Sequence, residues 1–570
     1  MNFNYTRNKT LIMVLLGLLI NNQLNGQHVD FGWANSTGGS LEEAGVSLTV
    51  DHLNNTYVLG NYSGTVDFNP GAENLNLSSK GSTDVFIQKF DDEGKLLWAR
   101  SIGGSGAENA SGICADSKGD IYVIGDFEDT VDFDPGPAEY DLISNGNTDV
   151  FVLKLNTHGD FQWVKTMGGS RSDFGIHITI DRTDKVYFTG AYEGTADLDP
   201  SGNTDSYTSR GAQDIFVEKL DSKGNLIWVR EMGSQFTDVA FDITTNDGGD
   251  CFITGFYSDD MDFDPGVGEQ LETSIGQGDL FIEKLDSNGN FVWVKTVNSP
   301  RTDRGQSLDI DSKGHVVVTG YFSGTVDFDP GEGTLDLKSV GAKDAFALKL
   351  DQQGKLIWAK SFGGDLNEIG NRLTIDEHDN IYIVGDYSRS IDWGKDHIKK
   401  ITAVDAQDAF IVVLTPNGEY LWARSVGGPG IDAGLAIDVN GQGDIVVTGS
   451  YSATADFNPF DQEFNLTSSG QSDAFLLQLE SWPAQLKTTQ NRATVSVFPN
   501  PTAAFITINS IDHPIDFVTV RDIEGRKLYR YTFNTLKSSH QVDLRKVQAG
   551  IYHLEIGMGN EIRSFLVLRE

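Results

Sequence analysis

The chain has 570 residues, with 82 Asp and Glu against 43 Lys and Arg, and its formal net charge of −39 disfavours nonspecific binding to nucleic acids or anionic membranes. Hydrophobic residues make up 39% of the chain and aromatic residues 10%, which is enough to bury a core and excludes wholesale disorder. Two cysteines exclude a disulfide-stapled scaffold and a Cys-rich metal protein, and the length indicates several domains or one large repetitive one.

The first 27 residues have the pattern of a secretory signal peptide. Arg7 and Lys9 precede an apolar run from Leu11 to Ile20, and a polar stretch follows and ends at Gln27. The apolar run is short for a permanent membrane anchor, and the lack of a cysteine near the cut site disfavours a lipoprotein. No other segment approaches membrane-spanning length, so we expect an exported, soluble mature chain, and we expect it to be a monomer.

Two markers recur through the middle of the chain with the same period. A Trp followed by Ala or Val recurs at intervals of 65 residues, and once of 64, at Trp33, Trp98, Trp163, Trp228, Trp293, Trp358 and Trp422. An Asp-apolar-Phe element or a close variant recurs with the same period at Asp84, Asp149, Asp214, Asp279, Asp344, Asp408 and Asp473. Two independent markers with one period indicate a tandem array of seven repeats.

Each repeat contains four short runs with the pattern of β-strands. In the first repeat they are Gly45–Val50, Thr56–Asn61, Asp84–Phe90 and Lys95–Ile102. Such runs are rich in β-branched and aromatic residues, and Asp-x-x-Gly turns such as Asp91–Gly94 join many of them. No stretch has sustained helical periodicity, so the fold class is all-β, and four strands repeated seven times predict a seven-bladed β-propeller over residues 28–483.

The two ends of the array favour a closed ring over a solenoid. A Trp-containing strand, Phe31–Asn35, precedes the first repeat without strands of its own to pair with. The last repeat has the strand Asp473–Leu479 but lacks the Gly turn and Trp strand that follow it elsewhere. The N-terminal strand is therefore predicted to complete the seventh blade and cover its edge, whereas a solenoid needs capping repeats.

The repeat resembles the SBBP-type β-propeller repeats of secreted bacterial proteins. The resemblance rests on Gly-x-Tyr-x-Gly-Thr-x-Asp-Phe-Asp-Pro-Gly, then Asp-x-Phe-x-x-Lys-Leu-Asp, then Gly-x-x-x-Trp, and it covers about residues 30–480. It implies the propeller architecture and no common catalytic activity.

A different segment follows a linker at residues 484–491. Residues 492–570 contain about seven short strands with turns between them, which predicts a small antiparallel β-sandwich. The opening Pro499-Asn500-Pro501 and the late Gly550-Ile551-Tyr552 resemble the type A C-terminal sorting domain of the type IX secretion system of Bacteroidetes, with Ala504 in place of the usual Gly. The resemblance implies export across the outer membrane by the type IX machinery, with the tail removed or used for surface attachment. An ordinary adhesive sandwich module is the alternative.

Three series of acids fall on loops at one face of the predicted ring. The second strand of each repeat ends at an Asp that has an acid or amide two residues later in most copies, and the third strand begins at the Asp of the marker. Asp-x-Asp and Asp-x-Asn offer two hard oxygen ligands on one loop, which suits Ca²⁺, although Asp at loop starts also caps turns. The candidate calcium ligands are Asp67, Asn69, Asp84, Asp132, Asp134, Asp149, Asp197, Asp199, Asp214, Asp262, Asp264, Asp279, Asp327, Asp329, Asp344, Asp456, Asn458 and Asp473.

The remaining series precedes the innermost strand of each repeat and is predicted to surround the channel mouth. Its members are Glu43, Glu108, Asp173, Asp238, Asp303, Glu368 and Asp432. Seven carboxylates at the mouth would attract a cation or a basic peptide. The alternative is that each carboxylate accepts hydrogen bonds from the backbone of the adjacent blade.

The sixth repeat differs from the others and offers a candidate contact patch. It replaces the Asp-Pro-Gly loop with Asp392-Trp393-Gly394-Lys395, and Lys399 and Lys400 follow. An exposed Trp393 beside Lys395, Lys399 and Lys400 would suit partner binding, whereas drift of a single repeat is the alternative.

No other pattern indicates a catalytic site. The recurring tryptophans are predicted to pack between blades, Cys114 and Cys251 are predicted to be buried thiols, and the spacing of His177, His315 and His378 does not suggest a metal triad. There is no phosphate-binding Gly-rich loop, Gly-x-Ser-x-Gly elbow or His-Glu-x-x-His motif. Paired carboxylates for glycoside cleavage stay open, because their pairing depends on the fold.

The sequence therefore favours a secreted or surface-attached, non-catalytic binding and scaffold propeller, with a glycan or protein ligand and Ca²⁺ at its acidic face. One alternative is a Ca²⁺-assisted polysaccharide hydrolase or lyase at the channel mouth. Another is a purely structural surface-layer component. A deep pocket with two carboxylates and a basic group would favour the enzyme.

Overall fold

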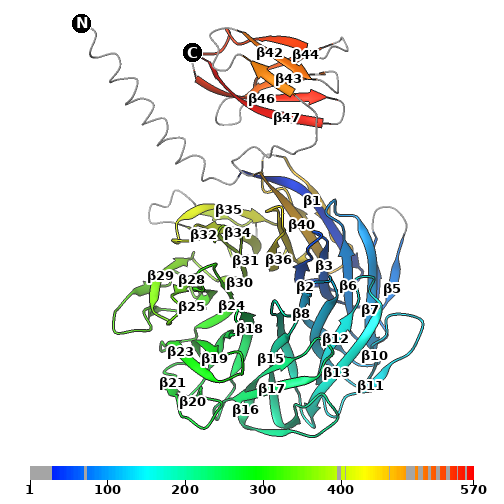
Figure 1. The fold of residues 1–570 in the computed structure, drawn as a ribbon, viewed down its shortest axis with the longest axis vertical. Helices are drawn as coiled ribbons and strands as arrows, with labels where there is room; N and C mark the ends of the chain where they lie inside the picture. The colour runs from blue at the N-terminus through cyan, green and yellow to red at the C-terminus, as the bar shows by residue number, and fades with distance from the viewer. Residues whose placement is uncertain are drawn as a thin grey trace. The chain divides into compact units, whose positions relative to one another are not determined.

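A computed structural model describes most of the chain (Figure 1). The described residues are 28–69, 74–393, 400–404, 406–460, 462–482, 495–498, 505–510, 515, 517–521, 527–533, 539–548, 550–558 and 561–569. The predicted signal peptide and linker lie outside these residues. The chain divides into two compact units, Met1–Ala484 and Gln485–Glu570, each of which is described by itself below. No helix in the described part of the chain is long and apolar enough to cross a membrane.

The first unit is built from strands, and its described residues contain no helix. The four long strands of each repeat pair antiparallel with one another as one sheet, and short pairings at the hairpins join some of these sheets to their neighbours. The first three sheets are β2(Glu43–Val50), β3(Thr56–Tyr62), β6(Asp84–Phe90) and β7(Leu96–Gly104); β8(Glu108–Ala115), β9(Ile121–Phe127), β12(Asp149–Leu155) and β13(Phe161–Gly169); and β14(Phe174–Ile180), β15(Val186–Asp197), β16(Ser206–Leu220) and β17(Leu226–Met232).

The next three sheets repeat the same order of strands. They are β18(Val239–Thr245), β19(Cys251–Tyr257), β22(Asp279–Leu285) and β23(Phe291–Val297); β24(Arg304–Ile310), β25(Val316–Phe322), β28(Asp344–Leu350) and β29(Leu356–Phe362); and β30(Glu368–Ile375), β31(Ile381–Tyr387), β34(Asp408–Leu414) and β35(Tyr420–Val426).

The seventh sheet combines both ends of the repeat array. Its strands are β36(Ala433–Val439), β37(Ile445–Tyr451), β40(Asp473–Trp482) and β1(His28–Gly39). β1 pairs antiparallel with β40, for example at Ala34 opposite Leu477. This is the pairing that the sequence predicted for Phe31–Asn35, although the strand is longer at both ends.

The first strands of the sheets contact one another in sequence around a common centre. Each contacts the first strand of the next sheet, and β36 of the seventh sheet contacts β2 of the first. Figure 1 shows these strands innermost, with the later strands of each sheet farther out. The described architecture is therefore all-β and propeller-like.

Short hairpins extend the connection between the second and third strands of most sheets. In the third sheet β15 and β16 themselves continue through this hairpin. Elsewhere it is formed by β4(Thr65–Asp67) with β5(Asn76–Ser78), β10(Thr130–Asp132) with β11(Asp141–Ile143), β20(Asp260–Asp262) with β21(Leu271–Thr273), β26(Thr325–Asp327) with β27(Asp336–Lys338), β32(Ser390–Asp392) with β33(Lys400–Thr402), and β38(Thr454–Asp456) with β39(Asn465–Thr467).

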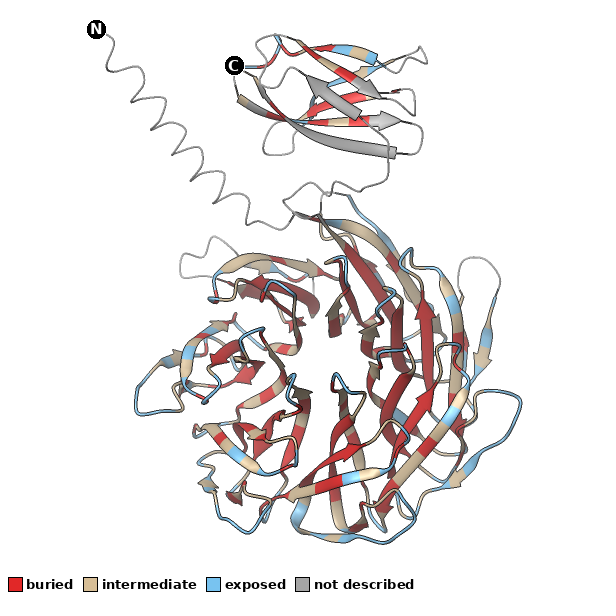
Figure 2. Cartoon of the chain, viewed as in Figure 1, coloured by how far each residue is buried: buried red, intermediate tan, exposed pale blue. Residues whose placement is uncertain are grey.

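The core consists of apolar side chains packed between neighbouring sheets. Tyr57 and Leu59 of β3, for example, share a buried cluster with Ile121 and Val123 of β9. Figure 2 shows buried residues on the inner strands and partly exposed ones along the outermost strands. The recurring tryptophans lie on these outer strands and reach the next sheet, as Trp98 Nε1 donates to the carbonyl of Thr157 at 3.2 Å. The predicted packing role of the tryptophans fits this contact.

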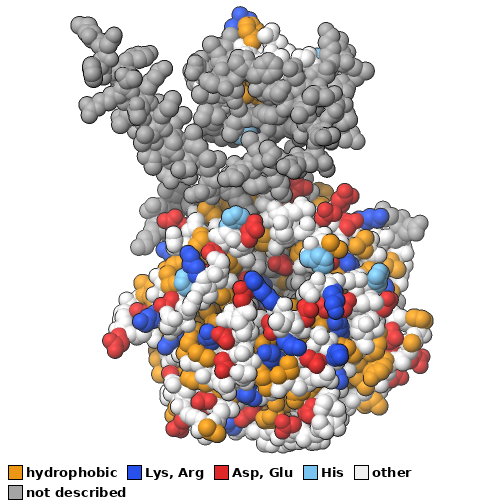
Figure 3. All heavy atoms as spheres, in the orientation of Figure 1, with side chains coloured by type: hydrophobic (Ala, Val, Ile, Leu, Met, Phe, Trp, Pro, Cys, Tyr) orange, Lys and Arg blue, Asp and Glu red, His pale blue; other side chains and the backbone are white. Residues whose placement is uncertain are grey.

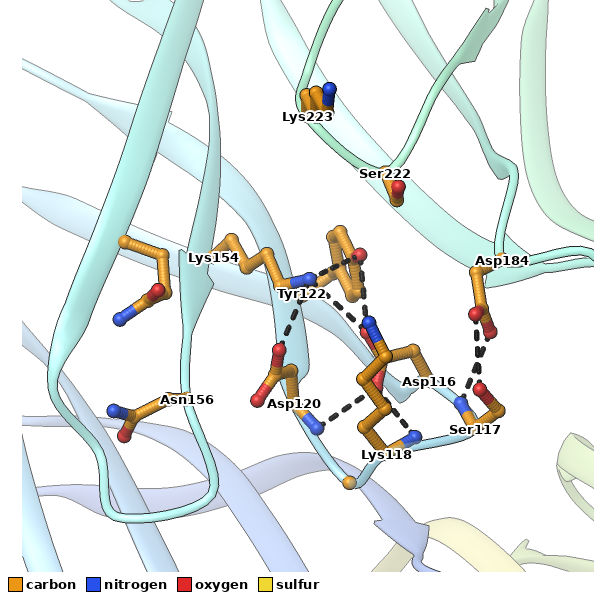
Figure 4. A network of polar contacts seen from close by, with 12 residues as sticks. Asp116, Ser117, Lys118, Asp120, Tyr122, Lys154, Asn156, Asp184, Ser222 and Lys223 are labelled. Carbon is orange, nitrogen blue, oxygen red and sulfur yellow. Dashed lines mark hydrogen bonds and ion pairs between the residues drawn. The ribbon is translucent and has the colours of Figure 1, made fainter.

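The Asp-x-x-Gly turns carry a polar network that also connects neighbouring sheets (Figure 4). In the second sheet, Lys154 Nζ lies 3.1 Å from Asp116 Oδ2 and 2.7 Å from the hydroxyl of Tyr122. Ser117 of the same turn donates through its N–H and hydroxyl to the carboxylate of Asp184, in the third sheet. The turns therefore hold a buried lysine and link one sheet to the next.

The second unit contains two antiparallel sheets that share one core. One sheet is β41(Val495–Phe498), β42(Phe505–Ser510) and β45(Ser539–Asp543), and the other is β44(Lys527–Thr532), β43(Phe517–Arg521), β46(Gly550–Met558) and β47(Glu561–Arg569). Ile506 and Ile508 of the first sheet are buried in one cluster with Val518 and Leu554 of the second. The arrangement is a small β-sandwich.

Candidate functional site

The acids that end each second strand hold their own loops together. Asp197 Oδ1 accepts the N–H of Asp199 at 3.1 Å and of Asp205 at 2.9 Å. The same two bonds, to the residues two and eight positions later, are made by Asp67, Asp132, Asp262, Asp327 and Asp456. One oxygen of each candidate calcium ligand in this series is therefore used for loop folding, which is the alternative that the sequence left open.

The second acid or amide of these loops caps a turn of its own. Asp134 Oδ1 accepts the N–H of Gly136 at 2.8 Å, and Asp199 Oδ1 accepts that of Ser201 at 2.8 Å. Asp264, Asp329 and Asn458 make the equivalent bond. Among the described residues, no three His, Cys, Asp or Glu side chains converge closely enough to hold a metal by themselves.

The Asp that begins each third strand is buried and bonded to the preceding loop. Asp84 accepts the N–H of Lys80 at 3.0 Å and of Gly81 at 3.2 Å. Asp149, Asp214, Asp279, Asp344, Asp408 and Asp473 are buried in the same position. A Cβ on Gly103 would lie 1.9 Å from Asp84 Oδ2, so the carboxylate packs directly against this glycine.

The acids predicted to surround the channel mouth are buried between sheets. Glu108 Oε2 accepts the N–H of Gly104, which ends the preceding sheet, at 2.8 Å. Glu43, Asp173, Asp238, Glu368 and Asp432 make the equivalent bond four residues back. Asp303 accepts the N–H of Ser323 instead. All seven are at most 1% exposed, and for six of them the bond to the preceding sheet is the alternative that the sequence left open, namely that the backbone of the adjacent blade binds the carboxylate.

The acids that begin the third strands and the acids that precede the first strands lie in pairs at the boundary between sheets. A Cβ on Gly168 would lie 2.6 Å from Asp149 Oδ1 and 2.9 Å from Asp173 Oδ2, so both carboxyl groups face one glycine. Burial raises the pKa of Glu108 to about 8, and the charge of Asp84 adds to the effect. The acids of these pairs therefore bind protons at higher pH than exposed carboxylates do.

The patch predicted in the sixth repeat is not an exposed aromatic surface. Trp393 is only 5% exposed, and its ring packs against Phe362 and Phe410 with centroids 5.2 and 5.1 Å away. Lys395 and Lys399 and the side chain of Lys400 lie outside the described residues. The expectation of an exposed Trp393 is wrong, because the indole occupies a place in the core that a Phe occupies in most other repeats, such as Phe328.

Both cysteines are free thiols. Cys251 is buried, and Cys114 is partly buried on the innermost strand of the second sheet. Burial raises the pKa of both thiols well above the ordinary value, so neither has the character of a reactive thiolate.

A polar cluster that the sequence reasoning missed lies where the first strands of the seven sheets meet. A cavity of about 210 Å³ is surrounded by residues from the first strands of all seven sheets. In its wall, Asp242 Oδ1 lies 2.5 Å from His177 Nδ1 and 3.3 Å from Arg372 Nη1. Burial by itself would raise the pKa of Asp242, but the charges of His177 and Arg372 outweigh it and hold this pKa below the ordinary range.

Two further carboxyl groups line the same cavity. Asp309 accepts the N–H of Ile375 at 3.0 Å, and Asp438 accepts that of Val50 at 3.1 Å, so each is bonded to the next sheet in the ring. Burial raises the pKa of Asp309 to about 7 and that of Asp438 to about 6. The cavity therefore combines a guanidinium, an imidazole, one ionised carboxylate and two carboxyl groups that titrate near neutral pH.

The signal that locates this cluster is a position at which the repeats differ. Four residues after each channel-mouth acid, the seven repeats carry Ser47, Gly112, His177, Asp242, Ser307, Arg372 and Ala436. Loop and turn acids are copied almost unchanged from repeat to repeat, whereas this position varies in charge and size. Alignment of the repeats on one another would have found it.

The face of the repeat unit shown in Figure 3 is not a continuous acidic field. On the face shown in Figure 3, Lys and Arg side chains are interspersed with Asp and Glu over the repeat unit. The acids that begin the third strands and the acids that precede the first strands are buried. The prediction that these two series crowd an exposed face is therefore wrong.

Comparison with known proteins identifies the C-terminal segment. Residues 496–567 match the family described as secretion system C-terminal sorting domain. This segment is a type IX sorting domain, and the protein is exported through type IX secretion to the cell surface or the medium.

Relatives of the repeat region share little sequence with this chain. An uncharacterized WD repeat-containing protein, L264, of Acanthamoeba polyphaga mimivirus is 23% identical over 76% of this chain. The regulatory protein FlaEY of Caulobacter vibrioides is 28% identical over 33% of it. These matches span 37% and 20% of the relatives' own lengths. Among solved structures, Sqt1 of Chaetomium thermophilum is 9% identical, with a TM-score of 0.36, over 79% of this chain and 99% of that one.

Proposed function

We propose that this chain is an exported, non-catalytic binding and scaffold protein, built as a closed seven-bladed propeller of the SBBP type. The pairing of β1 with β40 and the contact of β36 with β2 support closure. The similarity to a WD repeat-containing protein supports the propeller architecture, since WD repeats form propeller blades. Export through the sorting domain delivers the repeat unit to the outside of the cell.

The observation that carries the proposed binding role is the channel cluster. Arg372 and His177 both contact Asp242. The polar interactions in the loops and turns, by contrast, recur from repeat to repeat. A guanidinium and carboxyl groups around one cavity suit a polar ligand that both donates and accepts hydrogen bonds, such as the end of a glycan or a polar loop of a protein. Dependence of this binding on Ca²⁺ at the acidic loops is part of the proposal.

The binding proposal can be tested with the full mature chain on a glycan array and in pull-downs with xylan, alginate, pectin and chitin, each with CaCl₂ and with EDTA. We expect R372Q to lose at least tenfold in affinity for the retained glycan. R182Q removes an equally charged but exposed guanidinium, and we expect it to bind like wild type. Equal binding by R372Q and wild type would remove the channel from the proposal. A folded chain that retains no probe would favour the purely structural surface-layer role.

A second candidate function is a Ca²⁺-assisted polysaccharide hydrolase or lyase. Asp309 and Asp438, with pKa values of about 7 and 6, share a cavity with Arg372, and a carboxyl group that is protonated near neutral pH can act as a general acid. Against this role, each group already accepts hydrogen bonds from its own strand and from the next. Release of reducing or unsaturated ends from the same polysaccharides, and its loss in D309N, would replace the non-catalytic proposal.

A further inference from the structure

Two buried glutamates occupy a position that is apolar in most repeats. Glu218 on β16 and Glu283 on β22 each stand four residues after the first Asp of the third-strand motif, and both are 0% exposed. The equivalent residues in the other repeats are Gln88, Leu153, Leu348, Val412 and Leu477. Packing at this position favours an apolar side chain, so packing does not explain why the third and fourth repeats carry a glutamate there.

Neither glutamate has a polar partner in the structure. Both carboxylate oxygens of Glu218 and both of Glu283 are buried and accept no hydrogen bond. No Lys, Arg or His within the described ranges forms an ion pair with either, and the charges acting on them are those of other carboxylates. An ionised carboxylate that is buried without a partner is strongly destabilising, so each group requires a proton or a cation.

The first repeat shows what the end of this side chain faces. Gln88 Nε2 donates to the carbonyl of Phe68 at 3.1 Å, and Phe68 lies between Asp67 and Asn69 of the acidic loop. The equivalent carbonyls are those of Leu198 in the third repeat and Phe263 in the fourth. An amide can donate to a carbonyl, whereas an ionised carboxylate cannot.

The buried glutamate occurs only in repeats whose loop carries two acids, although the second and fifth repeats combine such a loop with a leucine. The first repeat carries two amides, Asn69 in the loop and Gln88 on the strand. The third and fourth repeats carry acids at both places, and the charges of Asp197 and Asp199 act on Glu218 as those of Asp262 and Asp264 act on Glu283. The loop carboxylates therefore lie near the glutamate, although three carboxylates do not converge on one point among the described side chains. Carboxylates and a main-chain carbonyl are the oxygen-only ligands that Ca²⁺ prefers.

We propose that the third and fourth repeats each bind one Ca²⁺, through Glu218 with the Asp197–Asp199 loop and through Glu283 with the Asp262–Asp264 loop. The loop carbonyl and water complete the coordination. The other loops, which lack this glutamate, bind none. This inference deepens the proposed calcium dependence by reducing it to two sites, and its test does not require a glycan or protein ligand.

The test uses the full mature chain, stripped of metal with EDTA and titrated with CaCl₂ by calorimetry, with Tm as a second measurement. We expect two Ca²⁺ per chain and a Tm that rises with Ca²⁺, because an ion that binds only the folded state stabilises it. We expect E218L/E283L, which carries the residue found in the second, fifth and seventh repeats, to stay folded and to lose both the binding heat and the Tm shift. E218Q/E283Q reproduces Gln88 and serves if the leucine variant does not fold.

The fifth repeat provides the matched control. It has the same loop acids, Asp327 and Asp329, but Leu348 in place of the glutamate, so D329N should leave the stoichiometry at two. No binding heat in wild type, together with a higher Tm of E218L/E283L in EDTA, would mean that the glutamates are protonated and bind no metal. A stoichiometry above two, or the loss of one ion in D329N, would mean that the loops bind Ca²⁺ without the glutamates.

Discussion

At the scale of single residues, this protein uses carboxylates mainly as acceptors for its own backbone. Asp84 and Glu108 each accept N–H groups at a sheet boundary, and Asp67 accepts two from its loop. A carboxylate can satisfy several backbone donors at once in loops that lack a partner strand. The recurrence of acids in the repeat therefore follows from loop and boundary geometry.

Substitution of Gly103 tests how closely the carboxylate of Asp84 packs against the backbone. G103A places a Cβ 1.9 Å from Oδ2 of Asp84, which is 0% exposed and is held by two backbone bonds. We expect a loss of about 1–3 kcal/mol of stability from this overpacking, measured by urea denaturation. G248A adds a methyl group in an exposed turn, 3.2 Å from the Asn246 side chain, and should change stability by less than about 0.5 kcal/mol.

The buried lysine of Figure 4 offers a second test at this scale. K154Q leaves the carboxylate of Asp116, which is 2% exposed, without its lysine, and we expect a loss of about 3–5 kcal/mol. The seventh repeat has Gln478 and Asn440 at these two positions, and Asn440 Oδ1 makes the same turn bonds. K154Q/D116N should therefore recover much of the loss in a double-mutant cycle, and a double variant no more stable than K154Q would contradict the pairing.

At the scale of elements, β1 completes the seventh sheet from the opposite end of the repeat array. It pairs with β40 along nine register positions from His28 to Thr37 and continues to β4, where Gly38 lies opposite Asp67. Without β1, the backbone N–H and C=O groups of β40 would form an open edge, and open edges promote association between chains. The strand thus stabilises the sheet and protects its edge.

Deletion of residues 28–37 tests this role. We expect the truncated chain to melt at a lower temperature than the chain that begins at His28 and to form soluble aggregates through β40. Scanning calorimetry and size-exclusion chromatography measure the two effects. A monomeric truncated chain with an unchanged Tm would show that β1 adds nothing to the stability of the repeat unit.

At the scale of the whole molecule, the formal charge of −39 overstates the negative charge of the folded protein. Burial raises the pKa of Glu43 to about 7, of Glu108 and Glu368 to about 8, and of Asp173 and Asp303 to about 6. These groups hold protons in the folded state at a pH at which the unfolded chain has released them.

Stability should consequently fall as the pH rises from 5 to 9. A carboxyl group whose folded pKa is raised contributes stability below its unfolded pKa of about 4, and this contribution is lost as the pH passes through the folded value. We expect a lower Tm at pH 9 than at pH 5 in EDTA, and a flatter profile for E108Q/E368Q. E377Q, at an exposed position, should follow wild type. A profile that E108Q/E368Q leaves unchanged would contradict the assignment.

Much of the fold was predictable because it depends on local patterns. Strand alternation and the Asp-x-x-Gly turns act within a few residues, and Gly94 and Gly119 adopt the positive φ that these turns require. The exposure of side chains was not predictable in the same way. Trp393 fills a core position, and Glu108 is buried, because residues of neighbouring repeats cover them.

The sequence by itself determined the all-β class, the seven repeats, the order of strands and the C-terminal sorting domain, since each leaves a local or periodic signature. Only the tertiary structure decided which acids face solvent and which residues meet in the cavity between the first strands. His177, Asp242 and Arg372 lie in three different repeats, and their contact exists because the first strands pack around one centre. Many of the acidic residues that are conspicuous in the composition thus lie inside the molecule, because backbone donors from neighbouring sheets and loops bind their carboxyl groups.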